Sequence, residues 1–342
     1  MSADSPLLLL LGSSHRVASL EDRERINLPA DSIEPFLQNL AELPGLEEHL
    51  LLNTCNRTEI YAVTRPPLTG DDLLDLLARF RSLEPDFLRK RSYLCEGETV
   101  IRHVFEVAAG LDSQMVGETE ILGQVKQAYE DAGTRGSAGK NLHRLFQKSF
   151  QAAKWARTHT GVSRGQISLG NVICELSRRI FGNVADCRLL VVGSGEVAEL
   201  ALDAFKSRGA RGITVTGRTY EKARELAESA SGSVLAFDAF RDSLHLFDVV
   251  LCSTAGDERV LAETDVRASI ARRPARPLFL IDVAMPRDVE TTAGNLENVY
   301  LYNLDDVSAI ANENLKSRQA EVSRCRQALA TRAEKLCRNL QL

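Results

Sequence analysis

The fold of the second half of the chain is decided by the stretch Leu189-Leu190-Val191-Val192-Gly193-Ser194-Gly195-Glu196-Val197-Ala198. Its four leading apolar residues predict a buried strand, and the two glycines predict a tight turn into a helix. In this G-x-G-x-x-A pattern the first glycine permits the turn, the second lets a pyrophosphate approach the backbone, and the alanine packs the helix on the strand. The phosphates then lie at the helix N-terminus. The pattern predicts a parallel α/β sheet with cofactor contacts from Gly193, Ser194, Gly195, Glu196, Val197 and Ala198.

The residues after the second expected strand, 213–216, indicate which dinucleotide binds. This strand ends in Gly217-Arg218-Thr219. A fold specific for NAD usually has Asp or Glu here for the ribose 2′-hydroxyl, whereas an arginine suits the 2′-phosphate of NADP. Further strands are expected at 248–254 and 278–284. We therefore predict NADPH as the cofactor, with Arg218 and Thr219 in its site.

A possible nucleophile lies in the first half of the chain. Asn53-Thr54-Cys55-Asn56-Arg57-Thr58-Glu59-Ile60-Tyr61 reads as the end of a strand, a polar turn and a second strand. A guanidinium near the thiol of Cys55 favours the thiolate, the form that attacks carbonyls. The alternative is a small buried core cysteine. The polar neighbours Asn53, Thr54, Asn56 and Arg57 favour the functional interpretation.

The other elements of the first half are expected to support this turn. The spacing predicts a first strand at 7–11 and helices at 32–43, 71–80, 98–109 and 141–158. His103 falls off the apolar stripe of its helix, which fits either a functional or a merely solvated side chain. Residues 110–124 mix glycines, carboxylates and amides, as in a loop that lines a polar pocket. A simple turn and a capped helix are the alternative.

Composition places the chain among ordinary globular proteins. It has 342 residues, 44% of them hydrophobic and 26% charged, and a net charge of −5. That charge gives no global attraction to nucleic acid, so such a partner needs local basic patches. The seven cysteines are scattered without a C-x-x-C pair, which predicts reduced thiols, no zinc site and a cytoplasmic protein. No apolar stretch approaches the roughly 20 residues that span a bilayer.

Two segments are locally basic. Helix 141–158 carries Arg144, Lys148, Lys154 and Arg157, and the tail 305–342 is the most basic part of the chain. In the tail, Val322, Cys325, Leu329, Leu336 and Leu340 form a helical apolar stripe. The tail therefore reads as a helix packed on the body, as an inter-chain helix or as an RNA contact. The charges on both segments could also be a solvated face.

The combination of an activatable cysteine and an NADP-type domain predicts thioester chemistry. A thiolate attacks an activated acyl carbonyl, and the acyl-enzyme then accepts a hydride and collapses to an aldehyde. The residues alone thus predict an NADPH-dependent acyl reductase and leave the substrate open.

The motifs, taken together, closely resemble the glutamyl-tRNA reductase family. The resemblance runs from about residue 8 to about residue 320. It rests on Thr54–Glu59, Gly110–Ser113, Gly117-Glu118, Ile121–Gln124, Gln147–Phe150, Gly193–Ala198, Arg218-Thr219, Ser253-Thr254, Pro286–Asp288 and Tyr300–Tyr302.

The resemblance implies an NADPH-dependent reduction of glutamyl-tRNA(Glu) to glutamate-1-semialdehyde, the first step of tetrapyrrole synthesis. Cys55 would be the nucleophile and His103 an activity-supporting residue. Substrate contacts would fall on Thr54, Asn56, Arg57, Ser113, Glu118, Thr119, Glu120 and Gln124. Arg57 could hold a substrate carboxylate with its fork, and Glu118 or Glu120 could hold the ammonium group. The aldehyde product would pass to the following aminomutase.

The expected organisation is a catalytic and glutamyl-recognition domain at 1–160, a Rossmann-type NADPH-binding domain at 161–303 and a long C-terminal helix at 304–342. Relatives usually continue this helix into a dimerisation domain, which we expect to be largely absent. A monomer or a weak homodimer through the helix is the corresponding prediction. Two other functions stay open, namely a non-catalytic paralogue that binds tRNA or the aminomutase, and a shikimate-type dehydrogenase. The latter would need a Lys–Asp pair and no cysteine hairpin.

Overall fold

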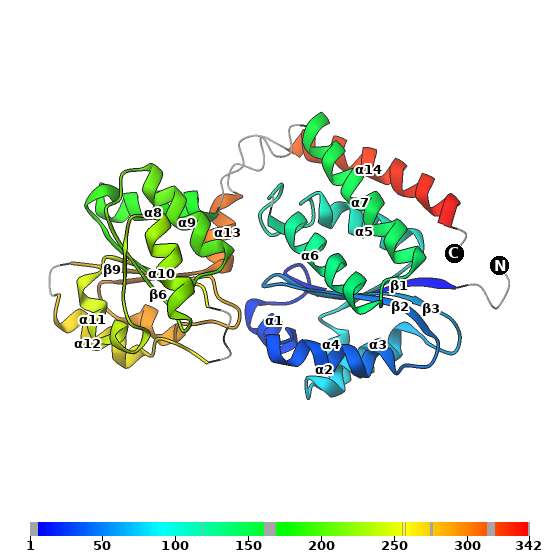
Figure 1. The fold of residues 1–342 in the computed structure, drawn as a ribbon, viewed down its shortest axis with the longest axis horizontal. Coiled ribbons are helices and arrows are strands. Elements are labelled where there is room, and N and C mark those ends of the chain that lie inside the picture. The colour runs from blue at the N-terminus through cyan, green and yellow to red at the C-terminus, as the bar shows by residue number, and fades with distance from the viewer. Residues whose placement is uncertain are drawn as a thin grey trace. The chain divides into compact units, whose positions relative to one another are not determined.

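The computed structural model divides the chain into two compact units (Figure 1). The first comprises residues 1–166 and 312–342, and the second comprises residues 167–311. The structure describes residues 6–118, 120–160, 169–254, 256, 258–273, 276–312 and 319–340. Among these residues, no helix is long and apolar enough to cross a membrane.

The first unit is built on an antiparallel sheet, which within the described residues has four strands in the order β2-β3-β1-β4. The strands are β1 (Leu7–Ser14), β2 (Leu46–Asn53), β3 (Arg57–Thr64) and β4 (Tyr93–Glu96). The predicted hairpin around Cys55 is confirmed, because β2 and β3 pair from Leu46 to Asn53 and leave residues 54–56 as the turn. The first strand extends further than predicted and ends beside this turn, where Ser14 pairs with Arg57.

Helices cover both faces of this sheet (Figure 1). On one face, Leu9 and Leu11 pack with helices α1 to α4, and on the other Leu8 and Leu10 pack with α5, α6, α7 and α14. A strand covered on both sides is apolar throughout, which explains the leucine run. The helices are α1 (Leu20–Ile26), α2 (Ala30–Ala41), α3 (Gly70–Phe80), α4 (Pro85–Arg89), α5 (Glu98–Ala108), α6 (Glu120–Arg135), α7 (Lys140–His159) and α14 (Gln319–Leu340).

The C-terminal segment is described as two helices, α13 (Leu304–Ala311) in the second unit and α14 in the first. Four of the predicted stripe residues, Val322, Cys325, Leu329 and Leu336, are buried on α14 within the core shared by α5 and α7. Of the three interpretations of the tail, packing on the body is therefore the one seen for α14. The side chain of Leu340 lies outside the described residues.

The second unit is a doubly wound α/β domain, as predicted. Its parallel sheet has, among the described residues, six strands in the order β10-β9-β8-β5-β6-β7. The order reverses between β5 and β8, and in such sheets ligands bind at this switch point, outside the carboxyl ends of the strands. The strands are β5 (Arg188–Val192), β6 (Gly212–Thr216), β7 (Ser233–Val234), β8 (Val249–Cys252), β9 (Leu278–Asp282) and β10 (Val299–Asn303).

The helices of the second unit flank this sheet, with α9 following β5 directly, as the glycine pattern predicts. They are α8 (Leu169–Phe181), α9 (Glu196–Ser207), α10 (Tyr220–Ser229), α11 (Phe240–Ser243), α12 (Glu263–Ala271) and α13. The strand β5 is buried along Leu189–Val192, so its apolar run also reflects cover on both faces.

Candidate active site

The turn that carries Cys55 is held by its own polar side chains. The hydroxyl of Thr54 accepts hydrogen bonds from the backbone amides of Asn56 and Arg57, both at 3.2 Å. The amide of His15, just after β1, donates to the Asn56 carbonyl at 3.0 Å. The polar residues that favoured a functional cysteine thus build a fixed turn around the thiol.

The pKa of the Cys55 thiol is set by more than the charge of Arg57. Burial and, after it, the negative charge of Glu118 raise the pKa of the Cys55 thiol to about 12. Arg57 and Arg23 favour the thiolate, but their effect is smaller. Arg57 thus favours the thiolate, as predicted, but burial and Glu118 outweigh it, so the thiol is neutral at pH 7 in this site.

The effect of Arg57 on the thiol is small because other groups hold its guanidinium. Its side chain is 1% exposed, and Nη1 donates to Glu59 Oε1 at 2.6 Å and to Asp112 Oδ2 at 3.3 Å. Nη2 donates to the backbone carbonyl of Asp112. Because two carboxylates already compensate this guanidinium, little of its charge remains for the thiol. The same contacts occupy the fork that was expected to hold a substrate carboxylate.

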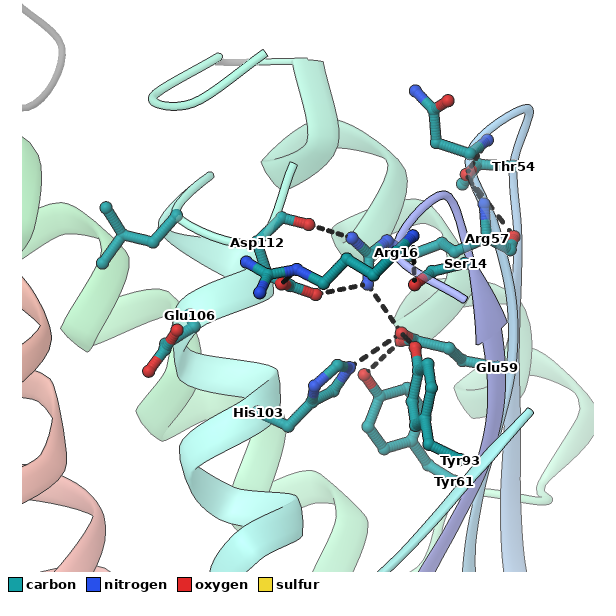
Figure 2. Close-up of polar contacts among 12 residues, drawn as sticks. Ser14, Arg16, Thr54, Arg57, Glu59, Tyr61, Tyr93, His103, Glu106 and Asp112 are labelled. Carbon is teal, nitrogen blue, oxygen red and sulfur yellow. Dashed lines mark hydrogen bonds and ion pairs between the residues drawn. The ribbon is translucent and has the colours of Figure 1, made fainter. Parts of the chain in front are cut away.

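Glu59 is the centre of a buried polar network (Figure 2). Its Oε1 accepts hydrogen bonds from Arg57, from the Tyr93 hydroxyl at 2.5 Å and from His103 Nε2 at 2.7 Å. Its Oε2 accepts from the Tyr61 hydroxyl at 2.6 Å. Although burial alone would raise it, the pKa of Glu59 is held well below its usual range, chiefly by Arg57 and then by His103.

His103 is positioned by this carboxylate. It projects from α5 toward Glu59, as Figure 2 shows, and is partly buried. An ionised carboxylate only accepts hydrogen bonds, so Nε2 of His103 carries a proton and donates it to Glu59. His103, which lies off the apolar stripe of α5, therefore makes a hydrogen bond to Glu59 beside the hairpin.

Asp112 connects the loop after α5 to the hairpin. Besides Arg57, it forms an ion pair with Arg16, which follows β1 (Figure 2). The loop turns back at Gly110, whose φ of +73° suits glycine and where an added Cβ would lie 2.6 Å from the Glu118 carbonyl oxygen. The turn thus returns the chain so that Glu118 acts electrostatically on Cys55.

Three polar atoms near the turn are buried without a hydrogen bond to any described residue. They are His15 Nδ1, Asn56 Oδ1 and Ser113 Oγ. Buried polar atoms are rarely left without a partner unless a site requires them. Desolvation, followed by the Arg57 charge, lowers the pKa of His15 to about 4, so this ring is neutral at pH 7.

The remaining predicted substrate residues lie on or before α6. Gln124 lines a groove of about 220 Å³ together with Asn53, the last residue of β2. Glu120 begins α6, and its charge acts on Arg157 of α7. Thr119 lies outside the described residues.

Sequence reasoning missed Glu59, Asp112, Arg16 and the two tyrosines as parts of the site. A sequence feature for some of them exists, because Arg57, Glu59 and Tyr61 alternate along β3 and so share one face of the sheet. That face is the one that α5 covers. Asp112 and Arg16 could not be found this way, since they come from loops.

The predicted cofactor residues lie together in the turn between β5 and α9. Gly193 has a φ of +113°, and an added Cβ would lie 2.5 Å from the Ser253 carbonyl oxygen. Gly195 caps α9 without a side-chain hydrogen bond, so the amides of the first helical turn, from Glu196 and Val197, are not used by a cap side chain. Ala198 is buried against the sheet. Ser194 is partly buried at the turn.

The surroundings of this turn also fit a dinucleotide. Ser253 Oγ, at the end of β8, is buried and makes no hydrogen bond within the described part of the chain. Thr254 is fixed by Asp288, which accepts from its amide at 2.9 Å and its hydroxyl at 2.6 Å. Arg218 is exposed and donates to the Glu258 carbonyl at 3.5 Å, and Thr219 begins α10. The residues present fit the phosphates of a nicotinamide dinucleotide.

A cysteine turn in one unit and a doubly wound dinucleotide-binding sheet in the other define an oxidoreductase that uses a nicotinamide cofactor. Residues 11–160 match the family model for the N-terminal domain of glutamyl-tRNAGlu reductase. Residues 175–310 match that of shikimate / quinate 5-dehydrogenase. The chain belongs to the glutamyl-tRNA reductase family.

Individual relatives support this assignment. The glutamyl-tRNA reductase of Trichlorobacter lovleyi is 40% identical over 324 residues, which are 94% of this chain and 75% of the relative. That of Aquifex aeolicus is 37% identical over 317 residues, or 93% of this chain and 77% of the relative. The solved glutamyl-tRNA reductase from Methanopyrus kandleri is similar with a TM-score of 0.52 and 33% identity, covering 97% of this chain and 80% of that chain. The resemblance predicted from the motifs is confirmed.

Proposed function

We propose that this protein reduces glutamyl-tRNA(Glu) to glutamate-1-semialdehyde with NADPH, as the first step of tetrapyrrole synthesis. The observation that carries the proposal is the fixed turn that holds Cys55 next to Asn56, whose Oδ1 is buried without a partner among the described residues, in a chain of this family. The substrate contacts we propose are Thr54, Asn56, Arg57, Ser113, Glu118, Thr119, Glu120 and Gln124, of which Arg57 would have to release Asp112 before its fork could hold a substrate carboxylate.

In the first step, the sulfur of Cys55 attacks the ester carbonyl carbon of the glutamyl group. The carbon–oxygen bond to the terminal ribose breaks, the ribose oxygen takes the proton that the thiol loses, and a thioester remains on Cys55. When bound, the nicotinamide cofactor supplies the two electrons and one hydrogen that reduce this thioester. The carbon–sulfur bond then breaks, the sulfur takes up a proton, and the aldehyde leaves.

The raised pKa of Cys55 requires activation by the substrate itself. We propose that the α-ammonium of the glutamyl group pairs with Glu118. This pair would cancel the negative charge that disfavours the thiolate, so the thiol would ionise only when substrate is bound. His103, held by Glu59 through Nε2, is proposed to support the activity of this site.

The cofactor assignment follows from the turn at Gly193 and the side chain of Arg218. We propose NADPH, with the pyrophosphate at the N-terminus of α9 and the 2′-phosphate near Arg218 and Thr219. Within the described residues, the exposed guanidinium of Arg218 forms no ion pair with a carboxylate, which leaves its charge for a phosphate.

The cellular setting and partners are also proposals. The seven cysteines are free thiols, as in a reducing compartment, and we place the enzyme in the cytoplasm. Its reactive aldehyde product fits direct transfer to a downstream aminomutase. For the chain as given we propose a monomer or a weak homodimer through the C-terminal helix, which light scattering would decide.

Single-turnover reduction of glutamyl-tRNA tests the function. Wild type with NADPH should form the semialdehyde, and Cys55→Ser should form none, because a serine hydroxyl is a far weaker nucleophile at neutral pH. Cys95→Ser, a partly buried thiol on β4 of the same unit, is the matched control and should keep the activity. An inert wild type that still binds charged tRNA would favour the regulatory paralogue instead.

A further inference from the structure

A groove of about 400 Å³ lies between α7 and α14 in the first unit. The two helices pack side by side, although about 170 residues separate them in sequence (Figure 1). The polar lining includes Arg144, Lys148 and Trp155 from α7 and Arg332, Lys335 and Asn339 from α14. The two basic segments noted in the sequence thus form one surface, which the proposed chemistry does not use.

The cations of this groove are not compensated. Among the described residues, none of Arg144, Lys148, Arg332 and Lys335 forms an ion pair with a carboxylate, whereas Glu334 on the same helix α14 pairs with Arg102 at 3.2 Å. Four positive charges therefore gather on a chain whose net charge is −5. Such a patch attracts a polyanion in spite of the overall charge.

The basic side chains are also held in place. Arg144 Nη1 donates to the Asn339 carbonyl at 2.8 Å, and Lys148 Nζ donates to Gln151 Oε1 at 3.0 Å. The Arg332 guanidinium lies 4.1 Å from the centre of the Trp155 ring. Each arginine has five N–H donors, so these single contacts leave most of them for a ligand. Ordered donors lose less entropy on binding than free surface lysines do.

We propose that this groove binds the phosphodiester backbone of RNA, and that it is a contact for the tRNA body outside the reacting end. The identity of the RNA rests on the proposed function. Rows of Arg and Lys along a groove are the chemistry with which proteins bind nucleic-acid backbones. The Trp155 ring stacks with His159 and lies beside Arg332, so its role in the groove is to hold the basic side chains. An acidic protein segment is the alternative occupant that the test separates.

Fluorescence anisotropy with labelled, uncharged tRNA(Glu) tests the groove separately from catalysis. The double variant Lys148→Gln/Lys335→Gln should bind roughly tenfold more weakly at about 150 mM salt. The slope of log K against log salt should fall in magnitude by about two, because two phosphate contacts are lost. Both lysines are exposed, and thermal unfolding should show an unchanged fold.

The matched control is Lys154→Gln/Arg338→Gln. It removes the same charge from the same two helices at exposed positions outside the groove, and it should bind within about twofold of wild type. Equal weakening by both double variants would overturn the proposal, as would an unchanged affinity in the groove variant. Tighter binding of polyglutamate than of tRNA by wild type would overturn it in favour of an acidic protein. A wild type that binds tRNA through the groove but forms no semialdehyde would contradict only the proposed function.

Discussion

At the scale of single residues, the chemistry depends on what compensates each buried charge. Arg57 and Glu59 are almost fully buried and form an ion pair at 2.6 Å. Arg57 therefore acts mainly on Glu59 and Asp112, while Cys55 is governed by burial and by Glu118. The pKa of a nucleophile follows from this distribution of partners and not from the nearest arginine in sequence.

Replacement of Glu118 tests this view of Cys55. In Glu118→Gln the loss of a negative charge should lower the pKa of the Cys55 thiol and so raise the rate of its alkylation by iodoacetamide at pH 8. Each unit by which the pKa falls should raise the rate about threefold, because more thiolate of slightly lower nucleophilicity is present. The rate is followed by mass spectrometry of the Cys55 peptide.

Glu120→Gln provides the comparison, because Glu120 lies two residues away and acts on Arg157. It should leave the alkylation rate of Cys55 unchanged. An acceleration in this variant, or none in Glu118→Gln, would show that Glu118 does not control the thiol.

Glu59 should also matter for stability. In Glu59→Gln the buried guanidinium of Arg57 loses its closest carboxylate, and removal of one partner of a buried pair typically costs about 3 kcal/mol or more. Glu47→Gln, which removes a partly exposed partner of Arg65, should cost less than about 1 kcal/mol. Urea unfolding followed by the fluorescence of Trp155, the single tryptophan of the chain, reports on the first unit. Equal losses in both variants would refute the central role of Glu59.

How far the sequence predicts these residues depends on the origin of each contact. Cys55 and its polar neighbours are adjacent in sequence, so their turn was predictable. Asp112 lies 55 residues from Arg57. Its contact with Arg57 is a tertiary contact that a single sequence does not contain. The burial that raises the pKa of Cys55 is likewise a property of the fold.

At the scale of elements, the two glycines of the turn between β5 and α9 have different roles. Gly193 is required by the backbone, because its φ is positive and the Ser253 carbonyl leaves no space for a Cβ. At Gly195 an added Cβ meets nothing within 4 Å. That open space is where the pattern predicts the approach of the pyrophosphate.

Two alanine variants separate these roles. In Gly193→Ala the new side chain would strain the turn, because the φ angle at this position is positive and the Ser253 carbonyl is close. The variant should therefore destabilise the second unit by about 1–3 kcal/mol and also weaken NADPH binding. Gly195→Ala should keep the thermal stability of wild type yet bind NADPH roughly tenfold or more weakly, since the methyl group blocks the phosphates. Calorimetric unfolding and NADPH fluorescence titration measure the two effects. A Gly195→Ala protein that binds NADPH normally would place the cofactor elsewhere.

Local patterns predicted most elements but not their partners. The hairpin, the helix α5 and the turn before α9 follow from periodicity and turn residues within short windows. The apolar stripe of α14 was also visible, but the stripe alone fits a neighbour in the same chain as well as one in another chain. Only the structure shows that α5 and α7 cover it.

At the scale of the whole molecule, the proposed chemistry assigns its two half-reactions to the two units. The first unit carries the cysteine turn and Glu118, and the second carries the turn between β5 and α9. If Cys55 is the nucleophile, acyl transfer needs only the first unit's residues and the charged tRNA. The thioester should then accumulate when no reductant is present.

Trapping of this thioester is the most direct test of the account. Protein is mixed with tRNA(Glu) charged with radiolabelled glutamate in the absence of NADPH, precipitated with acid and treated with neutral hydroxylamine, which cleaves thioesters. We predict that wild type and Cys95→Ser retain label, that hydroxylamine releases it, and that digestion places it on the Cys55 peptide. Retention of the label by Cys55→Ser, or its absence from a wild type that reduces glutamyl-tRNA once NADPH is added, would contradict the covalent mechanism.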